Sequence, residues 1–361
     1  MENFESTPKP EGAPECTVYY TPELVSKAIA ELTAESARSA IEERGYFTLG
    51  LAGGSLIKML SGLKKDTNEE NKIEWEKWHV FWVDERCVPL DDPESNFGGA
   101  YETLFKDVPI PRENLHAIDD GLYEANEGAS AKSAEAYDKE LKSLSETILP
   151  KGDGGLPIFD LLLLGFGPDG HICSLFPNHS LVKVNDARWI LPIADSPKPP
   201  PERITFSMPV VNMAKRKVFA AVGEGKAEMA KHILEDANKT DGSIPAAMVK
   251  DAEWLFDTTG SSKLTTTHVR FEFPGTPTLL GLDTKEEDWF MMRWWLVEEK
   301  RVIKILLSSL SLLLLRIIVH INLWIVRESQ KVIFVFAFFH AFPSDRFCLF
   351  HINLLELFVP I

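Results

Sequence analysis

The chain contains few cysteines, and their spacing does not suggest that they act together. Among its 361 residues there are four: Cys16, Cys87, Cys173 and Cys348. No two of them have the close spacing of a zinc site, and together they do not form the framework of a disulfide-rich domain. We therefore expect reduced thiols in a cytosol-like compartment, and no metal site.

Positive charge is also scarce. The chain has 38 Lys and Arg against 54 Asp and Glu, a formal net charge of −16. This sign excludes nucleic acids and anionic membrane surfaces as main partners, but a few local cations still suffice for a small anionic substrate. Residues 1–12 are acidic, contain proline and lack an apolar stretch. They have the pattern of neither a secretory signal nor an Arg-rich transit peptide.

Apolar runs alternate with helical patterns along most of the chain. The runs expected as strands are 46–52, 78–83, 159–165, 189–194, 203–208, 217–222 and 253–256. The segments expected as helices are 22–44, with Thr21 as N-cap, 130–148 and 226–235. This alternation predicts an α/β fold with a mostly parallel sheet and helices on both faces.

The composition changes from about residue 289. Residues 291–361 carry eight Lys and Arg against five Asp and Glu and are rich in Leu, Ile, Phe and Trp. A membrane span needs about 20 mostly apolar residues. Here Lys304 and Arg316 interrupt the longest run, and a charge at mid-bilayer costs about 2.5–3.5 kcal/mol. We expect an atypical apolar tail rather than a membrane span.

A Ser-Lys-Leu tripeptide at 262–264 precedes this tail. At a C-terminus it would be a peroxisomal address, but here it is internal. Our hypothesis is that the sequence after Leu264 comes from an alternative transcript or a read-through; the alternative is a chance tripeptide in a polar loop. We expect a flexible N-terminus at 1–17, a main domain at 18–264 and the apolar tail at 265–361.

The most informative segment is 159–171. A continuous apolar run there ends in Gly-Phe-Gly-Pro-Asp-Gly-His, which predicts a buried strand followed by a tight turn. Loops at the carboxyl ends of such strands line the ligand crevice of α/β folds, so His171 is expected there. Imidazole is suited to proton transfer near neutral pH. The alternative is a turn histidine that only bonds nearby backbone groups.

Other predicted strand ends offer groups suited to an anion. Gly53, Gly54 and Ser55 form a turn between a strand and a helix, where free backbone N–H groups favour a phosphate, although tight turns also use such residues for steric reasons. Arg86 could bind phosphate oxygens or only pair with its acidic neighbours. Lys226, at a helix start, needs an anionic partner. Arg203 is a further candidate cation.

Together these segments resemble the 6-phosphogluconolactonase family, in its plant form. The residues that carry the resemblance are Gly53 to Ser55, Trp82 to Arg86, Ser95 and Asn96, 165–171 with 174–177, Arg203 to Thr205, and Gly223 to Lys226. It covers about 18–256 and is most specific in the Gly-Pro-Asp-Gly-His block.

The resemblance implies a Rossmann-like sheet, no cofactor, and hydrolysis of 6-phospho-glucono-1,5-lactone in the oxidative branch of the pentose phosphate pathway. It makes His171 the general base that activates water, with Asp169 and Gly170 shaping its loop. The substrate and its phosphate would be held by Gly53, Gly54, Ser55, Arg86, Asn96, Gly170, Arg203 and Lys226. One departure is Leu56, where many relatives have Thr. We expect a cytoplasmic protein, or a peroxisomal one for a form ending at Leu264.

Two other functions stay open at this stage. Amino-sugar-phosphate deaminases share the fold and the Asp-Gly-His block, but typically have a Glu five residues after the His, where this chain has Phe176. Isomerisation needs that second acid or base. A non-catalytic sugar-phosphate sensor or membrane-tethered scaffold would instead work through the tail, and fractionation with membranes would reveal it.

Overall fold

The computed structural model describes residues 14–65, 73–119, 121–122, 128–236, 241–265 and 269–272, and the backbone of 334–341 and 350–357. The chain divides into two compact units, Met1–Thr276 and Pro277–Ile361. In the second unit, β12 (Phe334–Ala341) and β13 (Phe350–Leu357) pair in antiparallel fashion.

An eight-stranded sheet forms the centre of the first unit, in the order β11-β1-β10-β9-β6-β2-β3-β5, with every neighbouring pair parallel. The strands are β1 (Glu15–Tyr19), β2 (Phe47–Leu51), β3 (Trp78–Trp82), β5 (Leu115–His116), β6 (Leu161–Leu164), β9 (Arg216–Ala221), β10 (Glu253–Asp257) and β11 (Val269–Glu272). All residues of β2, β3 and β6 are buried. Both faces of the sheet are covered there, which explains the unbroken apolar runs.

A second, three-stranded sheet is antiparallel, in the order β4-β8-β7. It consists of β4 (Asp84–Arg86), β8 (Arg203–Phe206) and β7 (Ile190–Ile193). The strands predicted at 189–194 and 203–208 are therefore present, but in this second sheet and not in the parallel one. A parallel pair needs a crossover of about a dozen residues or more, usually helical, and the segment 194–202 offers neither.

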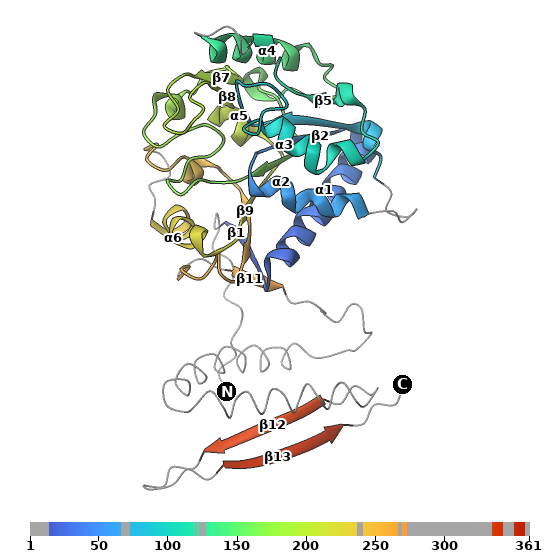
Figure 1. The fold of residues 1–361 in the computed structure, drawn as a ribbon, viewed down its shortest axis with the longest axis vertical. Coiled ribbons are helices and arrows are strands. Elements are labelled where there is room, and N and C mark those ends of the chain that lie inside the picture. Colours follow the sequence, from blue (N-terminus) through green and yellow to red (C-terminus); the bar gives the residue numbers. More distant parts are fainter. Residues whose placement is uncertain are drawn as a thin grey trace. The chain divides into compact units, whose positions relative to one another are not determined.

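The helices flank both sheets (Figure 1). They are α1 (Pro22–Arg44), α2 (Ser55–Met59), α3 (Asn96–Thr103), α4 (Ala129–Ser143), α5 (Met208–Met213) and α6 (Ala227–Lys231). Helix α1 packs against β1, β2 and β10, while α4 packs against β7 and β8. As predicted, Thr21 caps α1: its hydroxyl accepts the N–H of Leu24 at 3.3 Å. The predicted α/β fold with helices around a parallel sheet is thus confirmed.

Several boundaries differ from the expectation. The helix predicted at 130–148 ends at Ser143, because Leu144 is extended and a turn of Ile148 onto Ser145 follows. The helix predicted at 226–235 is a short 3-10 turn, then α6, then a π-helical turn. Strands β1 and β11 extend the sheet beyond 18–264 at both ends. The division of the chain into domains otherwise stays a prediction.

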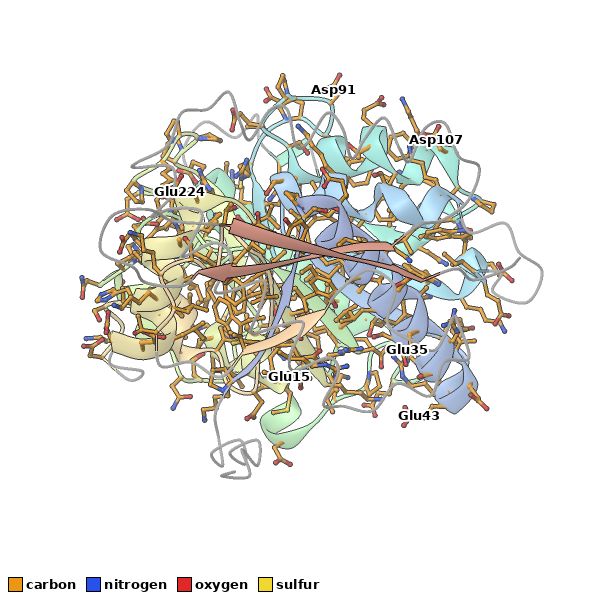
Figure 2. All side chains as sticks on the ribbon, turned by 90° about the horizontal axis from the view of Figure 1, so that it is seen from below. Glu15, Glu35, Glu43, Asp91, Asp107 and Glu224 are labelled. Carbon is orange, nitrogen blue, oxygen red and sulfur yellow. The ribbon has the colours of Figure 1, made fainter. Side chains whose placement is uncertain are left out.

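Acidic side chains lie on several sides of this unit (Figure 2). The labelled and exposed ones are Glu15, Glu35, Glu43, Asp91, Asp107 and Glu224. Among the described residues, no helix is long and apolar enough to cross a membrane. The apolar run of the tail, at 305–315, lies outside the described residues.

Candidate active site

Three adjacent parallel strands deliver the predicted site residues to one edge of the sheet. Strand β6 lies between β9 and β2. The loop after β6 leads to His171, the loop after β9 leads to Lys226, and Gly53 to Ser55 follow β2. The carboxyl ends of neighbouring parallel strands share an edge, which is where open α/β sheets bind ligands. Topology therefore places the loops that carry these three groups at the same edge of the sheet.

The loop after β6 is a tight turn that places His171. The N–H of Gly170 donates to the carbonyl of Gly167 at 3.0 Å, and the N–H of Gly167 donates to the carbonyl of His171 at 2.9 Å. Gly170 has a φ of +80°, a conformation that favours glycine. A Cβ on Gly167 would lie 2.0 Å from His171 Cε1. The imidazole occupies space that only a glycine leaves free.

His171 Nδ1 lies 2.5 Å from Asp169 Oδ1, and its ring lies on Phe176 with 4.7 Å between ring centroids. Burial lowers the pKa of His171, with a smaller lowering from the Lys198 ammonium, although Asp169 acts in the opposite sense. The imidazole is therefore neutral at neutral pH. With Nδ1–H donating to the Asp169 carboxylate, the lone pair is on Nε2.

Asp169 is the charged member of this pair. Burial raises its pKa, but the hydrogen bond from His171 and the charges of His171 and Lys198 outweigh burial and lower it overall. An ionised Asp169 fixes the tautomer of His171 and would stabilise an imidazolium. This arrangement suits a general base.

Lys198 is a site residue that the sequence did not reveal. Its Nζ lies 3.1 Å from His171 Nδ1 and 3.5 Å from Asp169 Oδ1. It comes from the proline-rich connection between β7 and β8, where no Gly-rich turn or helix start marks it. Only the antiparallel pairing of these strands brings it to His171.

Lys226 binds the backbone of the same loop. Its Nζ donates to the carbonyl of Phe166 at 2.5 Å and lies 4.8 Å from the centroid of the Phe166 ring. Burial lowers the pKa of Lys226, and the charge of Lys198 lowers it further. Two ammonium groups that repel each other, one of them 3.1 Å from His171, favour the binding of an anion.

The two arginines have other partners. Arg203 is 3% exposed and donates to the carbonyls of Lys198, Pro199 and Pro200, each at 2.9 Å. It therefore fixes the connection that carries Lys198. Arg86 Nη1 donates to the carbonyl of Glu94 at 2.7 Å, while its buried Nε is without a hydrogen-bond partner in the described part of the chain. Register pairs Arg86 with Arg203 in the second sheet.

Asn96 supports the glycine-rich turn after β2. A Cβ on Gly53 would lie 1.9 Å from Asn96 Oδ1, so the amide packs directly on that glycine. Asn96 Nδ2 donates to the carbonyl of Asp84 at 2.8 Å. Gly54, with a φ of +76°, is the N-cap of α2, which begins at Ser55. The predicted strand, turn and helix are therefore present.

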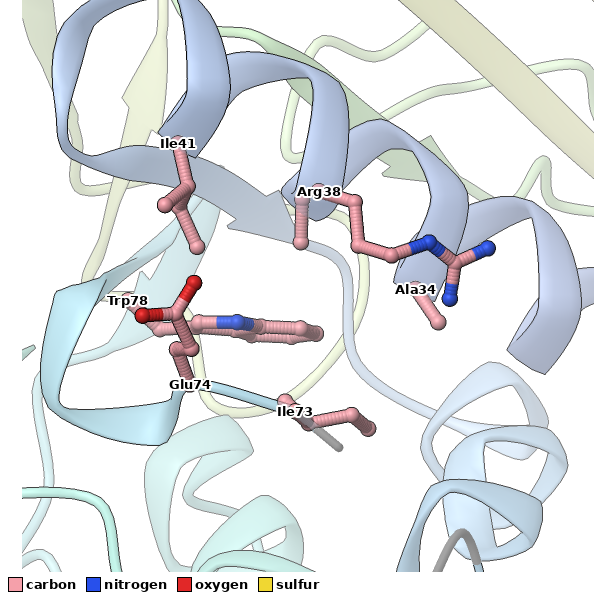
Figure 3. Close-up of a pocket in the computed structure, with 7 residues that line it drawn as sticks. Ala34, Arg38, Ile41, Ile73, Glu74 and Trp78 are labelled. Carbon is pink, nitrogen blue, oxygen red and sulfur yellow. The ribbon is translucent and has the colours of Figure 1, made fainter. Parts of the chain in front are cut away.

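A small hollow lies elsewhere, between α1 and the segment that leads into β3 (Figure 3). Its labelled lining residues are Ala34, Arg38, Ile41, Ile73, Glu74 and Trp78. Trp78 is the first residue of β3, at the end opposite to the carboxyl edge. The hollow contains none of the groups described above, and we assign it no chemistry. Within the described ranges, no three or more His, Cys, Asp or Glu are grouped to hold a metal.

Comparison with known proteins decides the family. Residues 20–257 match the sequence model of glucosamine-6-phosphate isomerases/6-phosphogluconolactonase. The chain belongs to this family. Among its curated relatives, 6-phosphogluconolactonase 3, chloroplastic, of Arabidopsis thaliana is 42% identical over 242 residues, which are 65% of this chain and 71% of the relative. Probable 6-phosphogluconolactonase 5 of the same plant is 41% identical over 249 residues, 68% of this chain and 97% of the relative.

Solved structures of the family have the same fold. The 6-phosphogluconolactonase of Trypanosoma brucei is 28% identical, with a TM-score of 0.59 over 70% of this chain and 99% of that one. A monomeric glucosamine-6-phosphate deaminase is 21% identical, with a TM-score of 0.52 over 69% and 99%. The deaminase shares the fold alone, so the two activities of the family have to be separated by the site.

Proposed function

We propose that this protein hydrolyses 6-phospho-D-glucono-1,5-lactone to 6-phospho-D-gluconate, in the oxidative branch of the pentose phosphate pathway. One observation carries the proposal: a neutral His171, oriented by Asp169, lies 3.1 Å from Lys198, whose charge is also felt by Lys226, and the two lysines are suited to a phosphate. The relatives named 6-phosphogluconolactonase, at 41–42% identity, support the same reaction.

In the proposed mechanism His171 activates water. Nε2 accepts a proton from a water molecule as its oxygen attacks the lactone carbonyl carbon. The imidazolium that forms is stabilised by Asp169, 2.5 Å from Nδ1. When the tetrahedral intermediate collapses, the bond from carbon to the ring oxygen breaks, and His171 returns the proton to the departing oxygen. A general base of this kind contributes about 10²–10⁴ in rate.

The phosphate end of the substrate is the proposed ligand of Lys198 and Lys226. Binding a remote dianion holds the carbonyl against the water, which converts affinity into orientation. Arg86 and the backbone of Gly53, Gly54 and Ser55 are further proposed contacts. The burial of Arg203 and Asn96 supports an indirect role for both, in which they fix the loops that touch the substrate.

The deaminase alternative is not favoured by the residue beside His171. Deamination with isomerisation needs a second acid or base near the histidine. Phe176 lies against the His171 ring and is apolar. The alternative of a membrane-tethered scaffold rests on the tail, outside the described residues.

We propose a cytoplasmic location, and a peroxisomal one for a form that ends at Leu264. Ser262 and Lys263 are exposed and Leu264 is half-buried, so little refolding would be needed to present this tripeptide. Fluorescent fusions at the N-terminus of residues 1–264 and of the full chain test both assignments. Import of the short form alone supports them, and the same distribution for both forms overturns the peroxisomal one.

The activity is tested on freshly prepared 6-phosphogluconolactone, with product formation coupled to 6-phosphogluconate dehydrogenase. Spontaneous ring opening is measured without enzyme and subtracted. We expect turnover of the lactone and none of glucosamine 6-phosphate. Turnover of glucosamine 6-phosphate without turnover of the lactone would show that the protein is a deaminase instead.

A further inference from the structure

Asp84 is a buried carboxylate behind the site that the mechanism does not use. It opens β4 and is 5% exposed. Its Oδ2 accepts the hydroxyl of Ser174 at 2.8 Å. The amide of Asn96 donates to its backbone carbonyl at 2.8 Å and lies 3.5 Å from its Oδ1. Burying a charge costs free energy even when it is hydrogen-bonded, so a carboxylate at this position needs an explanation.

The first branch from Asp84 reaches the histidine loop. Ser174 is fully buried and follows His171 by three residues. Its N–H donates to the hydroxyl of Thr205 at 3.2 Å, which fixes the chain just after the histidine to β8. The Ser174 hydroxyl therefore joins the loop of His171 to Asp84.

The second branch reaches Lys198. Arg203 Nη1 lies 3.5 Å from the Ser174 hydroxyl, and its Nε and Nη2 hold the three carbonyls from Lys198 to Pro200. Burial and the charge of Arg86 lower the pKa of Arg203, and the charge of Asp84 is the largest effect in the opposite sense. Asp84 is the first of three carboxylates, with Glu94 and Glu85, whose charges favour the guanidinium under the Lys198 segment, and the Ser174 hydroxyl links it to that guanidinium.

The third branch reaches the glycine-rich turn. Asn96, held by Asp84, packs its amide oxygen on Gly53. Three segments far apart in the sequence, at Gly53, His171 and Lys198, therefore share one buried support. Each of them carries a group that the proposed reaction uses.

We propose that Asp84 is a positioning residue of the lactonase reaction: through Ser174 and Arg203 it holds Lys198 against the Asp169–His171 pair. The inference rests on the proposed function. Asp84 is buried, and its oxygens are engaged by Ser174 and Asn96, so it acts through these residues and does not touch the substrate.

The test is a double-mutant cycle between Asp84→Asn and Lys198→Ala in the full chain. The Asn keeps the shape of the side chain and removes the charge. We expect Asp84→Asn to raise the KM for the lactone about tenfold in the wild-type background, since misplacement of a binding group by about 1 Å is costly. In the Lys198→Ala background the same change should raise KM by less than about twofold, because contacting groups are coupled.

Asp160→Asn is the matched control. Asp160 is equally buried, at 6% exposure, but it precedes β6 and lies at the opposite edge of the sheet. It should lower the melting temperature and leave KM unchanged in both backgrounds. Ser174→Ala is the milder second variant, which removes one hydrogen bond and keeps the charge. It should raise KM about threefold, again only while Lys198 is present.

The same double-mutant cycle can be measured without turnover, from the dissociation constant of 6-phosphogluconate for each variant by calorimetry. Equal effects of Asp84→Asn and Ser174→Ala with and without Lys198 would overturn the inference, as would effects confined to melting temperature. If Asp84→Asn does not fold, Ser174→Ala decides. A wild-type protein that binds 6-phosphogluconate without lactonase turnover would overturn the proposed function instead, while the binding cycle still tests the positioning.

Discussion

Strand β6 has a carboxylate near each end, and the two have opposite surroundings. At the amino end, Asp160 accepts the N–H and the hydroxyl of Thr48 at 2.8 and 2.9 Å and pairs with Arg44 and, at 3.4 Å, with Lys215. At the carboxyl end, Asp169 holds the single imidazole of His171 with Lys198 beside it. The Asp160 side chain is 5% exposed and that of Asp169 is 38% exposed.

The difference separates stability from chemistry. Asp160 meets its partners within the chain, from α1, β2 and the start of β9, so its network ties elements together. His171 uses Nδ1 for Asp169, and among the described residues none bonds to Nε2. Lys198 and Lys226 repel each other in the absence of an anion. The groups at the amino edge are therefore paired within the chain, whereas those at the carboxyl edge are the ones we propose to bind substrate.

The largest effect is expected at the amino edge. Asp160→Asn removes the carboxylate that pairs with the largely buried Arg44 guanidinium. Loss of one partner of a buried ion pair lowers the free energy of unfolding by about 3–5 kcal/mol. Denaturant unfolding of the variant measures this loss. Its kcat, assayed where the protein is folded, should equal that of the wild type. A loss of kcat without a loss of stability would contradict the view that the amino edge serves stability and the carboxyl edge serves catalysis.

Both edges have lysines that can be removed, two at the carboxyl edge and one at the amino edge. Lys198→Ala and Lys226→Ala should each raise the KM for the lactone about tenfold, through loss of about 1.4 kcal/mol of phosphate binding. Lys215→Ala, at the amino edge, is the control. Steady-state kinetics of the three variants should show a raised KM in the first two alone. A similar KM in all three would argue against the phosphate assignment.

Gly167 tests the placement of the imidazole. An Ala there would put Cβ 2.0 Å from His171 Cε1 and displace the ring, so kcat should fall about tenfold. Gly165→Ala is the control, since its Cβ would meet nothing within 4 Å. Crystal structures of both variants, beside their kcat values, check the cause. An unmoved ring with lowered kcat would contradict this explanation.

The smallest predicted effect concerns pH. Since burial, with a contribution from Lys198, lowers the pKa of His171 below 6.5, the base is free at neutral pH and becomes protonated only as the pH falls past that lowered value. Activity should therefore be lost on the acid side, below pH 6.5. In Lys198→Ala the midpoint should move to higher pH, because a repelling charge is gone. The profile of kcat/KM against pH measures both, and a midpoint that moves to lower pH would refute the role of Lys198.

How far the sequence could predict this site depended on where each group lies in the chain. Helix α1 and strands β2, β3 and β6 followed from apolar runs and turns, and so did the common edge for the loops of His171 and Lys226, because parallel strands deliver their loops to one edge. Lys198 was missed because antiparallel pairing of β7 with β8, with no local pattern, brings it there.

Arg203 illustrates a second limit of sequence reasoning. Residue type and position suggested a phosphate ligand, but burial under the Lys198 segment makes its guanidinium a support for backbone carbonyls. Strands β1 and β11 were missed for a different reason. They come from opposite ends of the unit and form only by pairing across the sheet, with β1 between β10 and β11.

The most direct test of the account is the turnover of 6-phosphogluconolactone by the wild type and by His171→Ala, with unfolding measured on the same samples. Because His171 is assigned as the base and not as a structural residue, kcat should fall by about 10²–10⁴ with little change in KM or melting temperature. Turnover of His171→Ala equal to that of the wild type would contradict the central claim.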